Sequence, residues 1–294
     1  MKLVKLVLRL VSQFAAALAV QFVGGQGMTA AQDNPALMVA AGVLTAVLGV
    51  FVYRLLVGRM ERRQVTELSA KGALPGLVGG TLGGLAIFGL VIVDIACNGG
   101  YQVHGLGTIP GAVGLFGFMA AAAATEELMY RGVLFRIIEE RTGTWISLVV
   151  TGLVFGMSHL LNPDADLWGA LAVAIEAGGM LTAAYVATRK LWVPIGLHFG
   201  WNFAAGGIFS TQVSGNGTSQ GLLNATTSGP DYLTGGAFGP EGSVISVGFC
   251  VVATIAFMWV AYRRGNVKPI PRRRQSDADQ QVAAESDVLT KLSR

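Results

Sequence analysis

Long apolar stretches with almost no charge restrict the fold of this chain more than any other feature. A helix of about 20 apolar residues spans a hydrocarbon core of about 30 Å. Only 13% of the 294 residues are charged and 52% are hydrophobic, whereas soluble domains carry roughly 25% charged residues. We therefore expect an all-α, polytopic membrane helical bundle. Eight apolar stretches predict its transmembrane helices, near 9–26, 35–57, 73–97, 111–138, 145–161, 167–188, 192–212 and 243–262.

Lysine and arginine alternate along the connections between these stretches. Every second connection is basic, beginning at the N-terminus and ending in the tail after 262. The other connections, 27–34, 98–110, 162–166 and 213–242, contain no Lys or Arg. Because cytoplasmic loops collect basic residues, this pattern predicts a multi-pass integral membrane protein with both termini in the cytoplasm.

The formal charge of +4 then reflects membrane orientation and attraction to anionic lipid headgroups. Nucleic acid is not an expected partner, since the basic residues are spread over several connections and form no basic domain with interleaved aromatic residues.

Three segments outside the central helices carry separate predictions. The outer segment 213–242 is rich in Gly, Ser and Thr, so we expect a flexible extracytoplasmic loop near a substrate entrance. The tail 263–294 is polar enough to be disordered and would act as a basic cytoplasmic anchor. The basic and apolar N-terminus also imitates a cleavable secretory signal, although its length favours a retained helix.

Three ionisable residues, Glu126, Glu127 and Arg131, lie within the fourth apolar stretch. Such side chains are costly in hydrocarbon and are usually kept where they face a partner or a cavity. Glu127 and Arg131 are four residues apart and share a helical face, which predicts an intrahelical ion pair. Glu126 points about 100° away around the helix axis. It is left without a partner and is the better candidate for a general base.

Other polar residues in the apolar stretches are few. His198 and Asn202 lie one helical turn apart and can donate two hydrogen bonds to an oxyanion, or can simply bond between helices. His159, taken alone, fits a helix interface better than a site. Glu176 either lines a water-filled cavity or pairs with a neighbouring polar group, and we expect the pairing.

Three short motifs occur in order in successive helices. They are EExxxR at Glu126–Arg131, FxxxH at Phe155–His159 and HxxxN at His198–Asn202. Together they resemble the CAAX protease and bacteriocin-processing family, also called CPBP or Abi, a group of intramembrane endopeptidases. The resemblance covers about 111–205. It divides the chain into variable N-terminal helices (1–110), a CPBP-like catalytic core (111–212), the outer loop, a final helix (243–262) and the tail.

The resemblance implies hydrolysis of a peptide bond in a membrane-associated protein or peptide. Glu126 and His159 would activate a water molecule, His198 and Asn202 would stabilise the oxyanion, and Glu127 with Arg131 would support the base. No cofactor is expected, although Glu126, His159 and His198 could bind zinc with an open fourth position. Two alternatives remain: a non-catalytic scaffold or regulator, and an ion-coupled transporter that uses Glu126 and Glu176.

Overall fold

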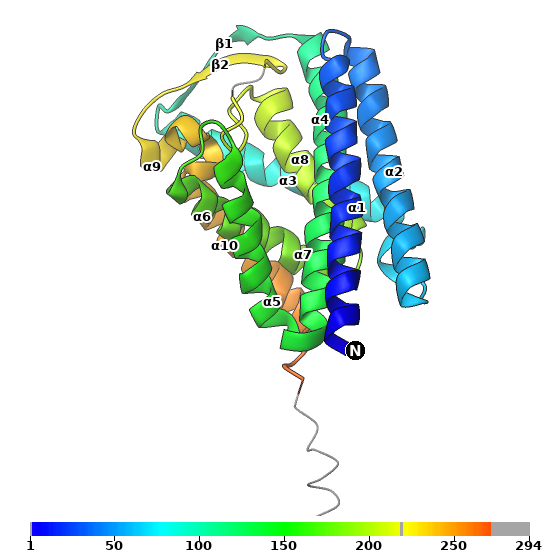
Figure 1. The fold of residues 1–294 in the computed structure, drawn as a ribbon. Coiled ribbons are helices and arrows are strands. Elements are labelled where there is room, and N and C mark those ends of the chain that lie inside the picture. Colours follow the sequence, from blue (N-terminus) through cyan, green and yellow to red (C-terminus); the bar gives the residue numbers. More distant parts are fainter. Residues whose placement is uncertain (1, 218–219, 272–294) are drawn as a thin grey trace, which may run out of the picture.

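The computed structural model describes residues 2–217 and 220–271 and is mainly helical (Figure 1). Two strands, β1 (Tyr101–Leu106) and β2 (Leu223–Thr227), lie at one end of the bundle. Short turns of 3-10 helix lie at Thr66–Leu68, His159–Leu161, Gly236–Phe238 and Pro240–Gly242. The helices are α1 (Lys2–Ala30), α2 (Pro35–Glu61), α3 (Ala73–Cys97), α4 (Ile109–Glu127), α5 (Arg136–Ser158), α6 (Leu167–Ile175), α7 (Thr182–Thr188), α8 (Trp192–Asn202), α9 (Asp231–Thr234) and α10 (Val244–Arg263).

The chain is an integral membrane protein with several long apolar helices. Within the described residues, six helices are long and apolar enough to cross a bilayer. The predicted count of eight is not confirmed. The two stretches predicted at 111–138 and 145–161 fall in one 53-residue run, Ile109–Leu161, which is interrupted at Gly143 by non-helical dihedral angles (φ 76°, ψ 173°). The stretch predicted at 192–212 forms α8 and a π-helical turn that ends at Ile208.

The basic connections gather at one end of the bundle, together with the N-terminus (Figure 1). Arg189, which follows α7, forms an ion pair with Glu139 of α5 at 2.6 Å. Lys190 donates to the carbonyl oxygen of Thr66, in the connection between α2 and α3. The connections without Lys or Arg lie at the opposite end, where Asn162 donates to the Ser214 carbonyl oxygen. That the basic end faces the cytoplasm stays a prediction.

The outer segment is more regular than its composition suggested. β2 pairs antiparallel with β1, although more than 100 residues separate them. The segment also contains α9 and two turns of 3-10 helix. The prediction of a flexible loop was therefore wrong about its secondary structure, and the all-α class holds for the helical bundle but not for this pair of strands. Its glycines serve tight turns instead, since Gly235 and Gly239 have positive φ angles of 76° and 99°.

Helices α3 and α8 pack with their backbones in close contact. A Cβ atom at Gly84 would lie 2.2 Å from the carbonyl oxygen of Leu197, and one at Gly80 would lie 2.3 Å from that of Val193. Gly200 of α8 contacts α3 in the same way, because a Cβ atom there would lie 2.1 Å from the carbonyl oxygen of Thr81. Small residues four apart are a common device for such close approach of membrane helices. This contact fixes the position of α8, which carries the HxxxN motif.

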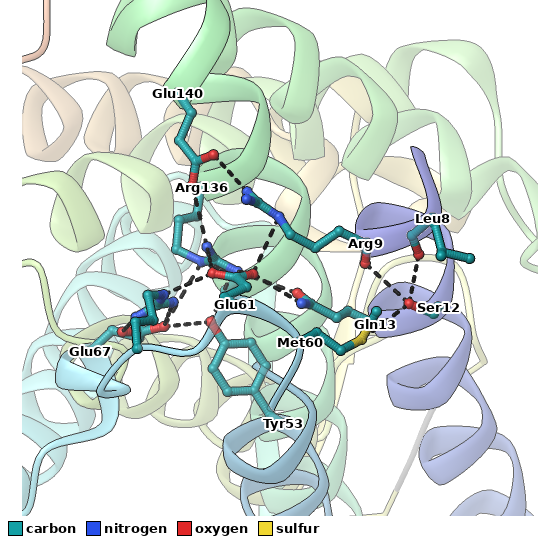
Figure 2. A network of polar contacts seen from close by, with 12 residues as sticks. Leu8, Arg9, Ser12, Gln13, Tyr53, Met60, Glu61, Glu67, Arg136 and Glu140 are labelled. Carbon is teal, nitrogen blue, oxygen red and sulfur yellow. Dashed lines mark hydrogen bonds and ion pairs between the residues drawn. The ribbon is translucent and has the colours of Figure 1, made fainter. Parts of the chain in front are cut away.

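A polar network at the basic end holds α1 and α2 against the chain that follows α4 (Figure 2). The Arg136 guanidinium binds Glu61 at 2.7 Å and donates to the Gly132 carbonyl oxygen at 2.8 Å. The Tyr53 hydroxyl donates to the same carbonyl oxygen and lies 2.7 Å from Glu67. Burial alone would raise the pKa of the Glu67 carboxyl, but hydrogen bonds, chiefly from Arg63, lower it below its ordinary value. The network therefore fixes the backbone at Gly132, which directly follows Arg131.

Matched alanine substitutions test the contact between α3 and α8. We expect Gly84→Ala to destabilise the protein by about 1–3 kcal/mol, because its methyl group collides with the α8 backbone. Gly89→Ala in the same helix meets no atom within 4 Å and should leave stability unchanged or raise it by up to about 1 kcal/mol. Unfolding of the detergent-solubilised protein measures both. Equal effects of the two substitutions would contradict the close packing.

Candidate active site

A cavity of about 850 Å³ lies between α1, α4, α8, the chain around α5 and α6, and the outer segment. All four residues predicted to be catalytic line it: Glu126, His159, His198 and Asn202. They come from three parts of the bundle, since Glu126 lies at the end of α4, His159 directly after α5, and the other two on α8. The structure thus brings the three sequence motifs together around one space.

The predicted ion pair between Glu127 and Arg131 is present and fully enclosed. Arg131 Nη1 lies 2.7 Å from Glu127 Oε1, and the two side chains are 1% and 0% exposed. The guanidinium also donates to Thr182 and to the carbonyl oxygen of Ala177. The same oxygen, Glu127 Oε1, also lies 2.9 Å from His198 Nδ1. A single carboxylate therefore joins α4 to α8, while its arginine reaches the segment after α6.

Glu126 has a different environment from its neighbour. Its side chain is 21% exposed, faces the cavity and has no Lys or Arg partner within the described residues. Gln21 of α1 lies 3.4 Å from Oε1, and His198 Nε2 lies 3.9 Å from Oε2. These distances leave Glu126 free to contact a small molecule in the cavity. The two adjacent glutamates are thus divided between a structural and a cavity-facing role, as their positions around the helix predicted.

The two histidines are oriented by hydrogen bonds at Nδ1. His159 Nδ1 lies 2.8 Å from the carbonyl oxygen of Phe155. Because a carbonyl oxygen only accepts, Nδ1 carries the proton, and Nε2 of the neutral ring is the acceptor. His198 Nδ1 is directed to Glu127, so its Nε2 is the atom directed to Glu126. Asn202 lines the cavity, and its side chain makes no hydrogen bond within the described residues.

Three π-helical segments adjoin the site. They are Leu128–Phe135, Glu176–Leu181 and Phe203–Ile208. The first begins directly after Glu127, the second begins at Glu176, and the third begins directly after Asn202. A π-turn inserts a residue into the helical repeat and is frequently found at functional sites. It rotates the residues on its two sides relative to each other, so the helical faces predicted from the sequence do not continue unchanged from one side of these segments to the other.

Glu176 requires a correction. We expected it to pair with a neighbouring polar group, but it lines the cavity, is 2% exposed, and makes no hydrogen bond or ion pair within the described residues. Its surroundings explain the difference. Gly178 packs directly on Gly152 of α5, and the nearest hydroxyl, on Ser246 of α10, is also without a hydrogen-bond partner. The neutral Ser246 hydroxyl thus adjoins the carboxylate, but no Lys or Arg side chain pairs with it within the described residues.

Sequence reasoning missed several cavity residues. Gln21 was not predicted as a site residue, although a glutamine in an apolar helix is itself a signal of a polar contact. Glu241 of the outer segment is 4% exposed and accepts hydrogen bonds from Trp201 Nε1 at 2.7 Å and from the Ser214 hydroxyl at 2.7 Å. Tyr130 donates to Ser158 at the cavity wall. Glu241 could not be predicted from the sequence, because its place in the cavity depends on how the outer segment folds against the bundle.

The residues considered for zinc do not form a metal site as placed. Within residues 2–217 and 220–271, no group of three or more His, Cys, Asp or Glu side chains is arranged to hold a metal ion. Glu126, His159 and His198 share the cavity but do not converge on one point at metal-ligand distances. We therefore derive no chemical step through a metal.

Comparison with protein families identifies the core of the chain. Residues 108–204 match the family described as Rce1-like, type II CAAX prenyl endopeptidase Rce1-like. This core segment is therefore similar to the CAAX protease family, and the match covers about a third of the chain. The match covers the three motifs. No match was found among curated proteins or solved structures.

Proposed function

We propose that this protein is an intramembrane endopeptidase that hydrolyses a peptide bond of a membrane-associated protein or peptide. The family match supports a protease of this type. The observation that carries the specific proposal is the contrast between Glu127, which is sealed against Arg131, and Glu126, which faces the cavity 3.9 Å from His198. A carboxylate that is not neutralised and can meet water is what a general base requires.

In the proposed reaction, Glu126 accepts a proton from a water molecule as the water oxygen attacks the peptide carbonyl carbon. His159 presents its unprotonated Nε2 to the same cavity and assists in orienting that water. The proton then passes from Glu126 to the leaving amine nitrogen as the carbon–nitrogen bond breaks. The products are a new carboxyl terminus and a new amino terminus, and the base is regenerated.

Asn202 and His198 supply the donors for the oxyanion. The Asn202 amide is uncommitted within the described residues, and it lies one turn beyond His198 on α8. Nδ1 of His198 is held by Glu127, which leaves Nε2 directed into the space beside Glu126. When Nε2 is protonated, it donates to the developing negative charge. Each such donor is worth about 3–4 kcal/mol in comparable acyl-transfer sites.

Removing the proposed base should abolish proteolysis. We expect Glu126→Gln to lower cleavage by about 10²-fold or more, because an amide cannot accept the proton of water. New amino termini in membrane proteins, compared by mass spectrometry between cells with active and variant enzyme, measure the effect. Glu140→Gln is the matched control, since Glu140 lies at the basic end and pairs with Arg9 at 2.6 Å. Undiminished cleavage by Glu126→Gln would contradict the mechanism, and unchanged partner binding without any cleavage in either form would favour a scaffold.

Metal dependence is tested separately. We propose that the carboxylate, imidazole and amide groups suffice, so the purified enzyme should keep its full rate after treatment with a zinc chelator and removal of the chelator. Elemental analysis of the same sample measures the residual zinc. Loss of cleavage on chelation, restored by added zinc, would overturn this proposal.

A further inference from the structure

The cavity is lined by carboxylates and has no Lys or Arg side chain among its described lining residues. Three glutamates line it: Glu126, Glu176 and Glu241. Arg131 lies close by, but it is 1% exposed and its guanidinium is occupied by Glu127, Thr182 and the Ala177 carbonyl oxygen. The space is therefore suited to a positively charged group rather than a negatively charged one.

Glu176 is the carboxylate in this cavity that the proposed reaction does not use and that no other group satisfies. It is 2% exposed, and its Oε1 is enclosed without a hydrogen-bond partner in the described part of the chain. A buried carboxylate without a partner is strongly unfavourable unless it is neutralised by a proton or by a cation. The nearby Ser246 hydroxyl could donate a hydrogen bond after a small shift, but a neutral hydroxyl carries no charge to balance it.

Glu241, in the outer segment, adds further negative charge to the cavity wall. Its two oxygens are held by Trp201, by the Ser214 hydroxyl and by the Ser214 backbone N–H. These donors are neutral, so they fix the carboxylate without cancelling its charge. The turn that carries Glu241, Pro240–Gly242, packs against α6 and α10. α6 ends directly before Glu176, and α10 packs against the π-helical segment that contains Glu176. Trp201 adjoins Asn202 in the sequence, which links this part of the cavity to the proposed oxyanion donors.

We propose that Glu176 is a substrate-binding group that pairs with a Lys or Arg side chain near the cleaved bond, with Glu241 adding to the negative potential. This inference rests on the proposed protease function and adds a substrate class to it. A basic side chain would bring the missing cation, and its long apolar stem suits the apolar walls that Met180, Leu181 and Val173 contribute. A substrate group with a free carboxylate would instead face three glutamates, so the preferred substrate is cleaved at an internal bond beside a basic residue.

The first measurement is a map of cleavage sites. Amino termini of membrane proteins that appear with the active enzyme and disappear with Glu126→Gln define the cleaved bonds. We expect Lys or Arg to be enriched at one fixed position beside these bonds. If Glu126→Gln removes no amino termini, the protease function itself fails. If sites are found but show no basic preference, only the present inference is overturned.

The second measurement compares kcat/KM of enzyme variants on a basic and a neutral form of one substrate. A substrate from that map is prepared with its basic residue intact and with Lys→Gln or Arg→Gln at that position. We expect Glu176→Gln to lower kcat/KM for the intact substrate by about 30-fold or more, because a buried charge loses its partner. The same enzyme variant should cleave the neutral substrate as well as the unmodified enzyme does. Glu176→Asp, which keeps the charge, should retain the basic preference.

The remaining outcomes decide against the inference. If Glu176→Gln lowers kcat/KM equally for both substrates, Glu176 only maintains the structure, and its partner is a group such as Ser246. If it changes neither rate, Glu176 is a neutral acid in the working enzyme. Monodispersity and thermal unfolding of each variant separate loss of folding from loss of recognition, with Glu140→Gln as the control for replacement of a glutamate outside the cavity.

Discussion

The buried carboxylate of Glu127 is the interaction on which the candidate site depends. Its Oε1 atom contacts both Arg131 and His198, and both contacts are shorter than 3 Å. Through them α4 is joined to α8, and Arg131 extends the connection to the chain after α6. A buried ion pair gains little net stability, but breaking it is costly. In the proposed mechanism, Glu127 fixes the relative positions of the groups around Glu126 and takes no part in the chemistry.

The packing of the bundle serves the same end. Glycines in α3 and α8 allow backbone contact, so α8 has no freedom to shift His198 and Asn202 away from the cavity. At the basic end, Tyr53 and Arg136 hold the Gly132 carbonyl oxygen, directly after Arg131 (Figure 2). At the opposite end, the outer segment places Glu241 into the cavity. The site thus lies between the polar network at the basic end and the outer segment at the opposite end.

Local patterns predicted what depends on local physics. Hydropathy placed the apolar helices, and the spacing of Glu127 and Arg131 predicted their ion pair. The three motifs indicated which helices share a site, and the cavity contains all of them. The π-turns, the pairing of β1 with β2 and the entry of Gln21 and Glu241 could not be predicted, because they depend on contacts between distant segments. The environment of Glu176 could not be predicted for the same reason, since only the packing of its neighbours shows that no basic side chain pairs with it within the described residues.

The most direct test of this account is a double-mutant cycle on the buried pair, measured as the free energy of unfolding in detergent. Arg131→Met leaves the Glu127 carboxylate enclosed without its cation and should cost about 3–5 kcal/mol. Adding Glu127→Gln to that variant should recover part of the loss, because the uncompensated charge is gone. If Arg131→Met costs less than about 1 kcal/mol and the two substitutions are additive, Glu127 does not organise the site as described.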